Sequence, residues 1–275
     1  MKIIRLNGGL GNQMFQYAFA KELEYLYPSD KIFLFGSNKE IQRIFDIDLP
    51  FATTKDVMML GDIKETYIGK IKRHYFRKKT HILERDFSYN EFLQKIIGDV
   101  YYDGYWQTEK YFSHYNSDIN NMFSFKLSID KKNTELFENG KQYCSIHIRR
   151  GDYTTIKGYD VIGLDYYNKA INYIIGKIPG VIFVFFSNDI EWCKKNFDIE
   201  DAIFVDWNQR ENSWQDLWLM SKCNYNIIAN STFSWWGAYL GKAEIVIAPK
   251  KWMNRKKDYY TYSFNDIIPE TWKRI

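Results

Sequence analysis

YCSIHIRRGDY, residues 143–153, decides the fold of the second half of this chain. Its apolar part, residues 143–148, predicts a buried strand, and Arg149 and Arg150 stand where that strand ends. Open α/β sheets bind ligands at the carboxyl ends of their strands. Two adjacent arginines are costly to bury without anions, and their donor forks match phosphate oxygens. The stretch therefore predicts a phosphate-bearing ligand above a sheet.

Further apolar runs alternate with stretches that are typical of helices. Strands are expected at 181–186, 202–205, 225–229 and 244–248, and helices at about 165–178, 189–197, 213–223 and 232–241. Alternating strands and helices predict a doubly wound parallel sheet. The start of the chain repeats this order, with strands at Ile3–Leu6 and Lys31–Phe35 around a glycine loop and a helix from about Met14 to Tyr27. Another strand is expected at Asp99–Trp106.

The length and composition limit the classes of protein. The 275 residues allow two domains, and the polar stretch Lys131–Lys141 predicts their boundary. A net charge of +4 is too mild to imply nucleic acid. The three cysteines are far apart and form no C-x-x-C pair, which argues against a disulfide framework and a zinc site.

The location of the protein is also an expectation from the sequence. The chain has no signal-peptide pattern and no apolar run near the ~20 residues that a membrane span needs. A cytoplasmic protein is therefore expected, at most peripheral to the inner membrane. The basic stretch 70–79 is either a solvated loop or a contact with an anionic membrane surface or a pyrophosphate-linked acceptor.

The glycine loop, residues 8–13, follows a strand and opens a helix. Glycines such as Gly9 and Gly11 let the backbone approach a ligand closely, and a helix N-terminus favours an anion. The spacing fits neither a Walker loop nor a G-x-G-x-x-G fingerprint. A tight turn between strand and helix is the alternative interpretation.

Two later loops each allow a structural and a functional interpretation. Ser187 and Asp189 either cap the helix that follows or line a ligand site at the end of their strand. Ser213 and Asp216 either form a capping box or leave the Asp216 carboxylate free to accept the N1–H and amino group of a guanine.

A cluster of hydroxyl groups follows the strand expected at 225–229. Ser231, Thr232 and Ser234 stand at a helix start, where backbone N–H groups lack partners and suit a phosphate. Capping and ordinary packing are the alternative. Trp235 and Trp236 cannot both face one core, so one of them is expected to face a cleft or the other domain.

Together these motifs resemble the bacterial α-1,2-fucosyltransferase family, glycosyltransferase family 11. The resemblance runs in order along about residues 1–250 and rests on five segments: GGLGNQMFQYA (8–18), GYWQTEKYF (104–112), HIRRGDY (147–153), FSND (186–189) and NSTFSWWGA (230–238). Asn188 departs from the aspartate expected in many members, but Asp189 remains.

The resemblance implies an α/β fold of the GT-B type, with two Rossmann-like domains and a cleft between them. Residues 1–135 would form the N-terminal, acceptor-side domain. Residues 136–275 would form the C-terminal, GDP-fucose-binding domain, with a last helix free to pack back on the first. The implied reaction is inverting transfer of L-fucose from GDP-β-L-fucose to the 2-OH of a terminal galactose. The acceptor would be an oligosaccharide or a lipid-linked glycan of an O-antigen or capsule, and no cofactor or metal is expected.

The resemblance also implies roles for matched residues. Arg149 would bind the β-phosphate with support from Arg150, and His147 and Asp216 would read the guanine. Asn12 would reach the phosphate or fucose from the N-terminal loop. The other residues expected to bind the donor are Gly9, Gly11, Ser187, Asp189, Asn230, Ser231, Thr232, Phe233 and Ser234.

Several questions stay open at the level of sequence. Asp152 is either a general base or the orienter of the arginines through a salt bridge. Acceptor choice is expected to depend on Tyr105, Trp106, Gln107, Glu109 and Lys110, because aromatic rings stack on sugars and polar groups read hydroxyls. The alternatives are another GDP-sugar transferase or an α-1,6-fucosyltransferase on the same fold. A further alternative is a non-catalytic binder, either a carbohydrate-binding protein or a surface ligand that uses residues 150–152 as a cell-adhesion tripeptide.

Overall fold

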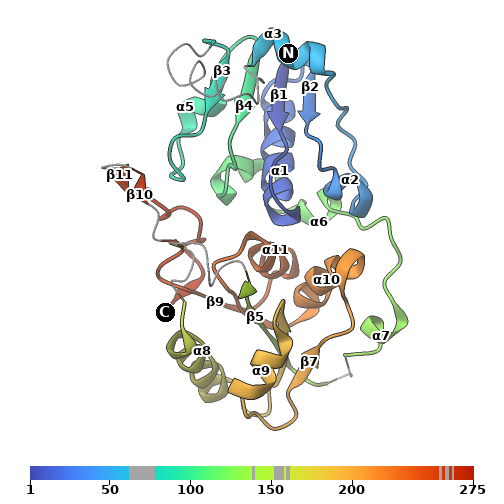
Figure 1. Cartoon of the computed structure of the whole chain (residues 1–275), viewed down its shortest axis with the longest axis vertical. Coiled ribbons are helices and arrows are strands. Elements are labelled where there is room, and N and C mark those ends of the chain that lie inside the picture. The colour runs from blue at the N-terminus through green and yellow to red at the C-terminus, as the bar shows by residue number, and fades with distance from the viewer. Residues whose placement is uncertain are drawn as a thin grey trace. The chain divides into compact units, whose positions relative to one another are not determined.

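The computed structural model describes residues 1–61, 78–137, 140–151, 158, 162–253, 256–257, 260–261 and 263–275. The chain divides into two compact units (Figure 1). Unit 1 contains Met1–Lys126 and Asn265–Ile267, and unit 2 contains Leu127–Phe264 and Ile268–Ile275. Residues 127–135, which the sequence analysis assigns to the first domain, thus belong to the second unit. Asn133 shows the reason, because its side chain is buried and donates to Asn208 at 2.9 Å and Gln215 at 2.7 Å.

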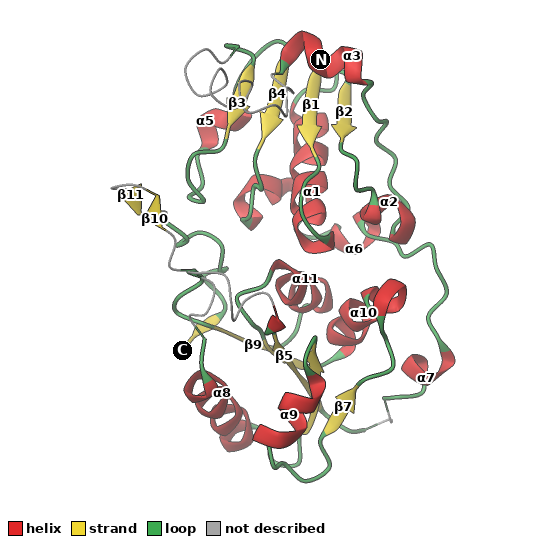
Figure 2. Ribbon diagram, viewed as in Figure 1, coloured by secondary structure: helices red, strands yellow, loops and turns green. Residues whose placement is uncertain are grey.

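Unit 1 is built on a parallel four-stranded sheet with the order β2-β1-β4-β3. The strands are β1 (Lys2–Arg5), β2 (Ile32–Phe35), β3 (His81–Leu83) and β4 (Val100–Asp103). The helices are α1 (Leu10–Leu26), α2 (Glu40–Ile44), α3 (Thr54–Leu60), α5 (Glu91–Gln94), the 3-10 helix η1 (Glu109–Tyr115) and α6 (Ile119–Met122). Figure 2 shows α1 alongside the strands.

Alternation along the strands of unit 1 supplies two apolar faces. Tyr101 of β4 packs in a cluster with Val57 and Leu60 of α3. Tyr102, the next residue, meets Phe19 of α1 edge-on with ring centroids 5.2 Å apart. The sheet is therefore buried on both sides, which holds the carboxyl ends of its strands in a fixed arrangement.

Unit 2 is built on a parallel six-stranded sheet with the order β12-β9-β8-β5-β6-β7. The strands are β5 (Tyr143–Ile148), β6 (Ile182–Ser187), β7 (Ile203–Val205), β8 (Tyr225–Ile227), β9 (Ile245–Ala248) and β12 (Lys273–Arg274). The helices are α7 (Lys131–Thr134), α8 (Leu164–Lys177), α9 (Ile190–Asn196), the 3-10 helix η3 (Arg210–Asn212), α10 (Trp214–Lys222) and α11 (Thr232–Gly241). Two short strands, β10 (Lys256–Lys257) and β11 (Tyr260–Thr261), pair with each other.

The expectation of two α/β domains with parallel sheets is confirmed. The predicted apolar strands correspond to β5, β6, β7, β8 and β9, of which β5 and β8 are buried throughout. On β6, Phe185 packs in one core while its neighbours Val184 and Phe186 pack in the other.

The carboxyl terminus differs from the prediction. The described residues after α11 contain no further helix, and the chain ends instead in β12, which pairs with β9. The short segment Asn265–Ile267 belongs to unit 1, where Asp266 forms an ion pair with Lys110 at 2.6 Å.

Candidate active site

The carboxyl end of β5 carries a buried histidine with an unpaired nitrogen. His147 is 6% exposed, its ring centroid lies 6.0 Å from that of Phe233, and its Nδ1 atom has no hydrogen-bond partner. Burial, aided by the charge of Arg149, lowers the pKa of His147 to about 3, so the ring is neutral. Buried polar atoms are rarely left unpaired, and a neutral imidazole can donate to or accept from a ligand. This side chain is therefore suited to hydrogen-bond a nucleobase.

Arg150 is engaged by the protein itself. Its Nε atom donates to Asp189 at 3.2 Å, and its guanidinium carbon lies 4.0 Å from the centroid of the Trp192 ring. These contacts leave other guanidinium N–H groups of Arg150 as possible donors, and its expected support of a phosphate stays a prediction. Arg149 is partly exposed beside it.

The loops after β5 and β6 hold each other. The backbone N–H of Arg150 donates to Asn188 Oδ1 at 2.9 Å. Gly151 has a φ of +53°, and a Cβ there would lie only 2.4 Å from Asn188 Nδ2. Glycine is required at this position both by the backbone conformation and by the close approach of Asn188.

Ser187 and Asp189 build the turn into α9. Ser187 Oγ accepts from the backbone N–H of Asp189 at 3.0 Å, and Asp189 Oδ1 accepts from the N–H of Trp192 at 3.2 Å. The helix-cap interpretation is therefore confirmed for Asp189. Its second oxygen holds Arg150, so the turn and the arginine are fixed together.

Asp216 lies in the first turn of α10 and is not part of a capping box. Ser213 makes no capping hydrogen bond with its side chain, so that interpretation is wrong. Asp216 Oδ1 instead accepts from Asn208 Nδ2 at 2.9 Å, and Asn208 is held in turn by Asn133. Burial raises the pKa of the partly exposed Asp216 to about 7. The carboxyl group keeps acceptor capacity for a ligand's N–H groups.

Helix α11 begins shortly after β8, so its N-terminus follows the carboxyl edge of the unit 2 sheet, where β5 and β6 also end. Ser231 is the residue before the helix and makes no side-chain cap, and the first turn contains no acidic residue. Ser234 donates to the Ser231 carbonyl at 3.3 Å, while Asn230 donates to the Trp252 carbonyl at 2.8 Å. Thr232 and Phe233 are partly exposed. This helix end presents N–H groups and a positive dipole to an anion.

The sequence analysis expects one of the tandem tryptophans to face a cleft or the other domain. Trp235 and Trp236 are both fully buried. Trp235 stacks on Tyr239 with ring centroids 4.5 Å apart and also meets Trp272 at 5.3 Å. Burial excludes an exposed position for either ring, and whether one of them faces the other domain stays a prediction.

The glycine loop of unit 1 is held by the polar residues of its own motif. Gly8 has a φ of +82°, and a Cβ there would lie 2.4 Å from Asn12 Nδ2. Gln13 donates to the Gly8 carbonyl at 3.0 Å, and Asn12 Oδ1 accepts from Gln107 at 2.9 Å. Gly9 is the residue before α1 and has no cap. Asn12 thus positions the loop, and its expected contact with the donor stays a prediction.

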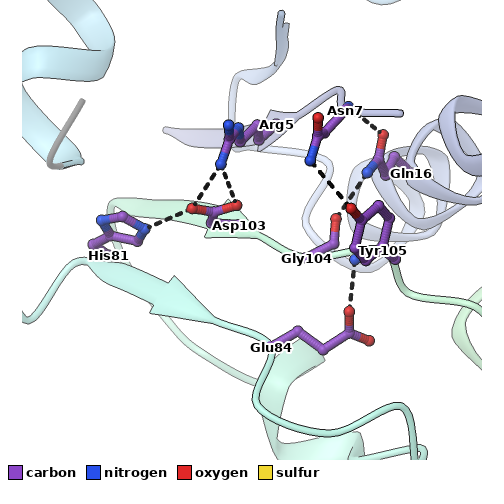
Figure 3. Close-up of polar contacts among 8 residues, drawn as sticks. All are labelled: Arg5, Asn7, Gln16, His81, Glu84, Asp103, Gly104 and Tyr105. Carbon is purple, nitrogen blue, oxygen red and sulfur yellow. Dashed lines mark hydrogen bonds and ion pairs between the residues drawn. The ribbon is translucent and has the colours of Figure 1, made fainter. Parts of the chain in front are cut away.

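Sequence reasoning missed a charged cluster at the carboxyl edge of the unit 1 sheet (Figure 3). Arg5 Nη1 donates to Asp103 Oδ1 at 2.9 Å and to Oδ2 at 3.1 Å, and His81 Nε2 lies 3.3 Å from Asp103 Oδ2. Burial alone would raise the pKa of Asp103, but His81 and Arg5 lower it below its usual value. Arg5 and Asp103 are charged residues at the ends of the apolar strands β1 and β4, and this pattern in the sequence could have indicated the cluster.

Glu84 is the other carboxyl group of this cluster. Its Oε2 atom accepts from the backbone N–H of Tyr105 at 2.6 Å, and its Oε1 atom from that of Trp106 at 3.2 Å. Burial raises the pKa of Glu84 to about 7 despite these two bonds.

Two predictions fall mainly outside the described residues. Asp152 is one of them, so its two interpretations stay predictions. Most of the basic stretch 70–79 is the other, although Lys78 donates to the carbonyls of Met58 and Met59. No helix that the structure describes is long and apolar enough to cross a bilayer. The described part of the chain likewise brings together no group of three or more His, Cys, Asp or Glu fit to hold a metal ion.

Comparisons with known proteins bear on the family and the fold of this chain. The chain is 35% identical to an α-1,2-colitosyltransferase of Escherichia coli, over 99% of this chain and 98% of that protein. It is 34% identical to the O-antigen biosynthesis glycosyltransferase WbnK of Escherichia coli, over 90% and 93% of the two chains. Its fold is similar to that of the fucosyltransferase NodZ from Bradyrhizobium, with a TM-score of 0.53 at 14% identity over 89% and 94% of the chains. The expected GT-B-type fold is thus confirmed. Residues 1–274 match the description of glycosyl transferase family 11, and the chain belongs to this family.

Proposed function

We propose that this protein is an inverting α-1,2-glycosyltransferase that moves L-fucose from GDP-β-L-fucose to the 2-OH of a terminal galactose in a surface glycan. The observation that carries the proposal is the buried, unpartnered Nδ1 atom of His147 at the carboxyl end of β5. Asp216 and the uncapped N-terminus of α11 follow strands that end at the same edge of the same parallel sheet. His147 and Asp216 offer hydrogen bonds to a nucleobase, and the N-terminus of α11 suits an anion at the same edge. This combination fits a purine nucleoside diphosphate.

The charges support a reaction in which GDP departs. As the bond between the anomeric carbon and the β-phosphate oxygen breaks, negative charge develops on the diphosphate. Arg149 and the N–H groups of α11 offer fixed positive charge to it, and such groups stabilise a transition state more than a ground state. Arg150, held by Asp189 and Trp192, keeps the turn that carries Arg149 in place.

The names of relatives support the transferred group and the linkage. The human galactoside α-(1,2)-fucosyltransferase 1 is 25% identical over 87% of this chain and 65% of that protein. NodZ, an α-1,6-fucosyltransferase with a similar fold, has been soaked with GDP-fucose. The name of WbnK, an O-antigen biosynthesis glycosyltransferase, supports a place in O-antigen synthesis. The acceptor that we propose is an oligosaccharide or a lipid-linked glycan.

A second donor is favoured by a specific observation, the 35% identity to an α-1,2-colitosyltransferase. Colitose is fucose without its 3-hydroxyl group, so GDP-colitose would occupy the same nucleotide site. Sites that hydrogen-bond a hydroxyl reject the analogue lacking it by ~10⁴–10⁵-fold, whereas apolar pockets discriminate weakly.

Competition between GDP-fucose, GDP-colitose and GDP-mannose on a panel of galactose-terminated oligosaccharides tests the proposal. We expect a product with the new sugar on O2 of galactose, identified by linkage analysis. A preference for GDP-colitose would correct the donor alone. A 1,6-linked product would correct the regiochemistry, and absence of transfer from every GDP-sugar would overturn the proposal.

A further inference from the structure

A network of buried amide groups in unit 2 joins α7, the loop after β7 and the first turn of α10. Asn133 and Asn208 exchange two hydrogen bonds, because the Nδ2 atom of each donates to the Oδ1 atom of the other, at 2.9 and 3.1 Å. Asn133 also donates to Gln215 at 2.7 Å, and Asn208 also donates to Asp216 at 2.9 Å. The three amide side chains belong to residues that are at most 7% exposed. The network thus ends on the carboxyl group that the proposed function assigns to guanine.

The orientation of the Asn133 amide is fixed by groups that can act in only one sense. The indole N–H of Trp207 can only donate, and it lies 2.7 Å from Asn133 Oδ1. The backbone N–H of Asp130 likewise donates to Gln215 Oε1 at 2.8 Å, and this same oxygen accepts from Asn133 Nδ2. Turning the Asn133 amide over would place donor against donor at Trp207 and acceptor against acceptor at Gln215. Asn133 therefore has one favourable orientation.

The orientation of Asn133 determines that of Asn208. Because Asn133 Oδ1 faces it, Asn208 must present its NH₂ group there, and the second hydrogen of this group reaches Asp216 Oδ1. Asp216 thus receives its hydrogen bond from a partner that cannot turn over. Burial raises the pKa of Asp216, and the hydrogen bond from Asn208 opposes that rise, so it favours the charged form. The carboxylate keeps acceptor capacity, because each of its oxygens can accept more than one hydrogen bond.

A carboxylate held in one orientation distinguishes between purines. Guanine offers it two adjacent donors, the N1–H and the 2-amino group, whereas hypoxanthine offers the N1–H alone and adenine has a lone pair at N1. We propose that Asn208 and Asn133 are positioning residues that hold the Asp216 carboxylate in the orientation that selects guanine. This inference rests on the proposed function and adds to it the residues that set the choice of base.

The competing interpretation is that the network only ties α7 to α10. Both interpretations predict a lower melting temperature for Asn208→Ala, because this change leaves a buried N–H of Asn133 without its acceptor. They differ in the selectivity for the base. A purely structural loss weakens the binding of purine nucleotides alike, whereas a misplaced Asp216 carboxylate weakens the binding of guanine most.

Calorimetry with GDP and with inosine diphosphate, which lacks only the 2-amino group, measures this selectivity. We expect the wild-type protein to bind GDP about 10–10²-fold more tightly, because the 2-amino group adds a hydrogen bond to a charged group. Asn208→Ala should lower this ratio of affinities by about 3–30-fold. Once Asp216→Asn has lowered the ratio, adding Asn208→Ala should change it by less than about twofold, because Asn208 acts through Asp216.

Asn226→Ala is the matched control. Asn226 is a fully buried amide of the same unit, and it donates to Ser145 and Met220 instead of to the network. The control variant should lower the melting temperature and keep the wild-type ratio of GDP to inosine diphosphate affinity.

A wild-type ratio in Asn208→Ala would overturn the inference while leaving the proposed function intact, and so would an equal loss of selectivity in Asn226→Ala. Wild-type protein that binds GDP no better than inosine diphosphate would instead contradict the contact of Asp216 with guanine in the proposed function, and the inference with it. Should Asn208→Ala fail to fold, Asn208→Ser decides, because its hydroxyl is too short to reach Asp216. A lowered ratio in that variant supports the inference, and a wild-type ratio contradicts it.

Discussion

Asp216→Asn should stabilise the free protein at alkaline pH and weaken its affinity for GDP. Asp216 is partly exposed, accepts one hydrogen bond from Asn208 and has a pKa raised to about 7 by burial. An asparagine oxygen can still accept from Asn208, so the replacement removes the charge with little change in shape. The substitution thus tests whether this carboxylate is kept for a ligand at the expense of stability.

The direction of the stability change with pH follows from the number of protons that the folded and unfolded states bind. Unfolded Asp216 ionises near its ordinary pKa of 3.8, whereas the folded group holds its proton up to about pH 7. The folded protein therefore binds more protons between these values, and its stability falls as the pH rises through this window. This rise in pKa, from 3.8 to about 7, corresponds to at most ~4 kcal/mol of lost folding stability above pH 7. Partial exposure screens this, so a gain of ~1–2 kcal/mol, or about 2–8 °C, is expected at pH 8.

Thermal melts at pH 4 and pH 8, paired with GDP calorimetry at pH 8, measure both effects. Loss of a charged acceptor for guanine should weaken GDP binding by ~10–10²-fold, from about 1.5–3 kcal/mol per charged hydrogen bond. The exposed Asp198 of the same unit is the control, and Asp198→Asn should leave GDP affinity unchanged. A variant that is no more stable at pH 8 than at pH 4, relative to wild type, would refute the linkage. Unaltered GDP affinity would refute the contact with guanine.

The remaining predictions concern the two loops of the sequence motifs. Gly8→Ala should lower the free energy of unfolding by ~1–3 kcal/mol in denaturant titration, because position 8 has a φ of +82° and a Cβ there would lie 2.4 Å from Asn12. Gly9→Ala should be nearly neutral, because a Cβ at position 9 meets nothing within 4 Å. Equal effects of the two variants would contradict this. Arg149→Lys should lower kcat by ~10²–10³-fold, since lysine lacks the bidentate fork. Arg150→Lys should lower the melting temperature, because lysine has neither the Nε–H group that donates to Asp189 nor the planar guanidinium that lies over the Trp192 ring. Wild-type turnover by the Arg149 variant would refute its assignment to the phosphate.

The sequence by itself determined the family and most of the fold. Strands buried on both faces are read as continuous apolar runs, which is why β5 was predicted at its true bounds and β6 within one residue. The residues of the five motifs stand next to one another in the chain, so their order was visible without coordinates. The strands β3 and β12 were missed because two or three residues carry no periodicity to detect.

Only the tertiary structure decided what each polar side chain contacts. Arg150 has its partner 39 residues away, because β5 and β6 pair in parallel and bring their following loops together. Glu84 meets the backbone of Tyr105 for the same reason, through the register of β3 and β4. Parallel strands must be joined by long crossovers, so the groups at a shared sheet edge are distant in sequence and their contacts depend on register, which local pattern does not encode.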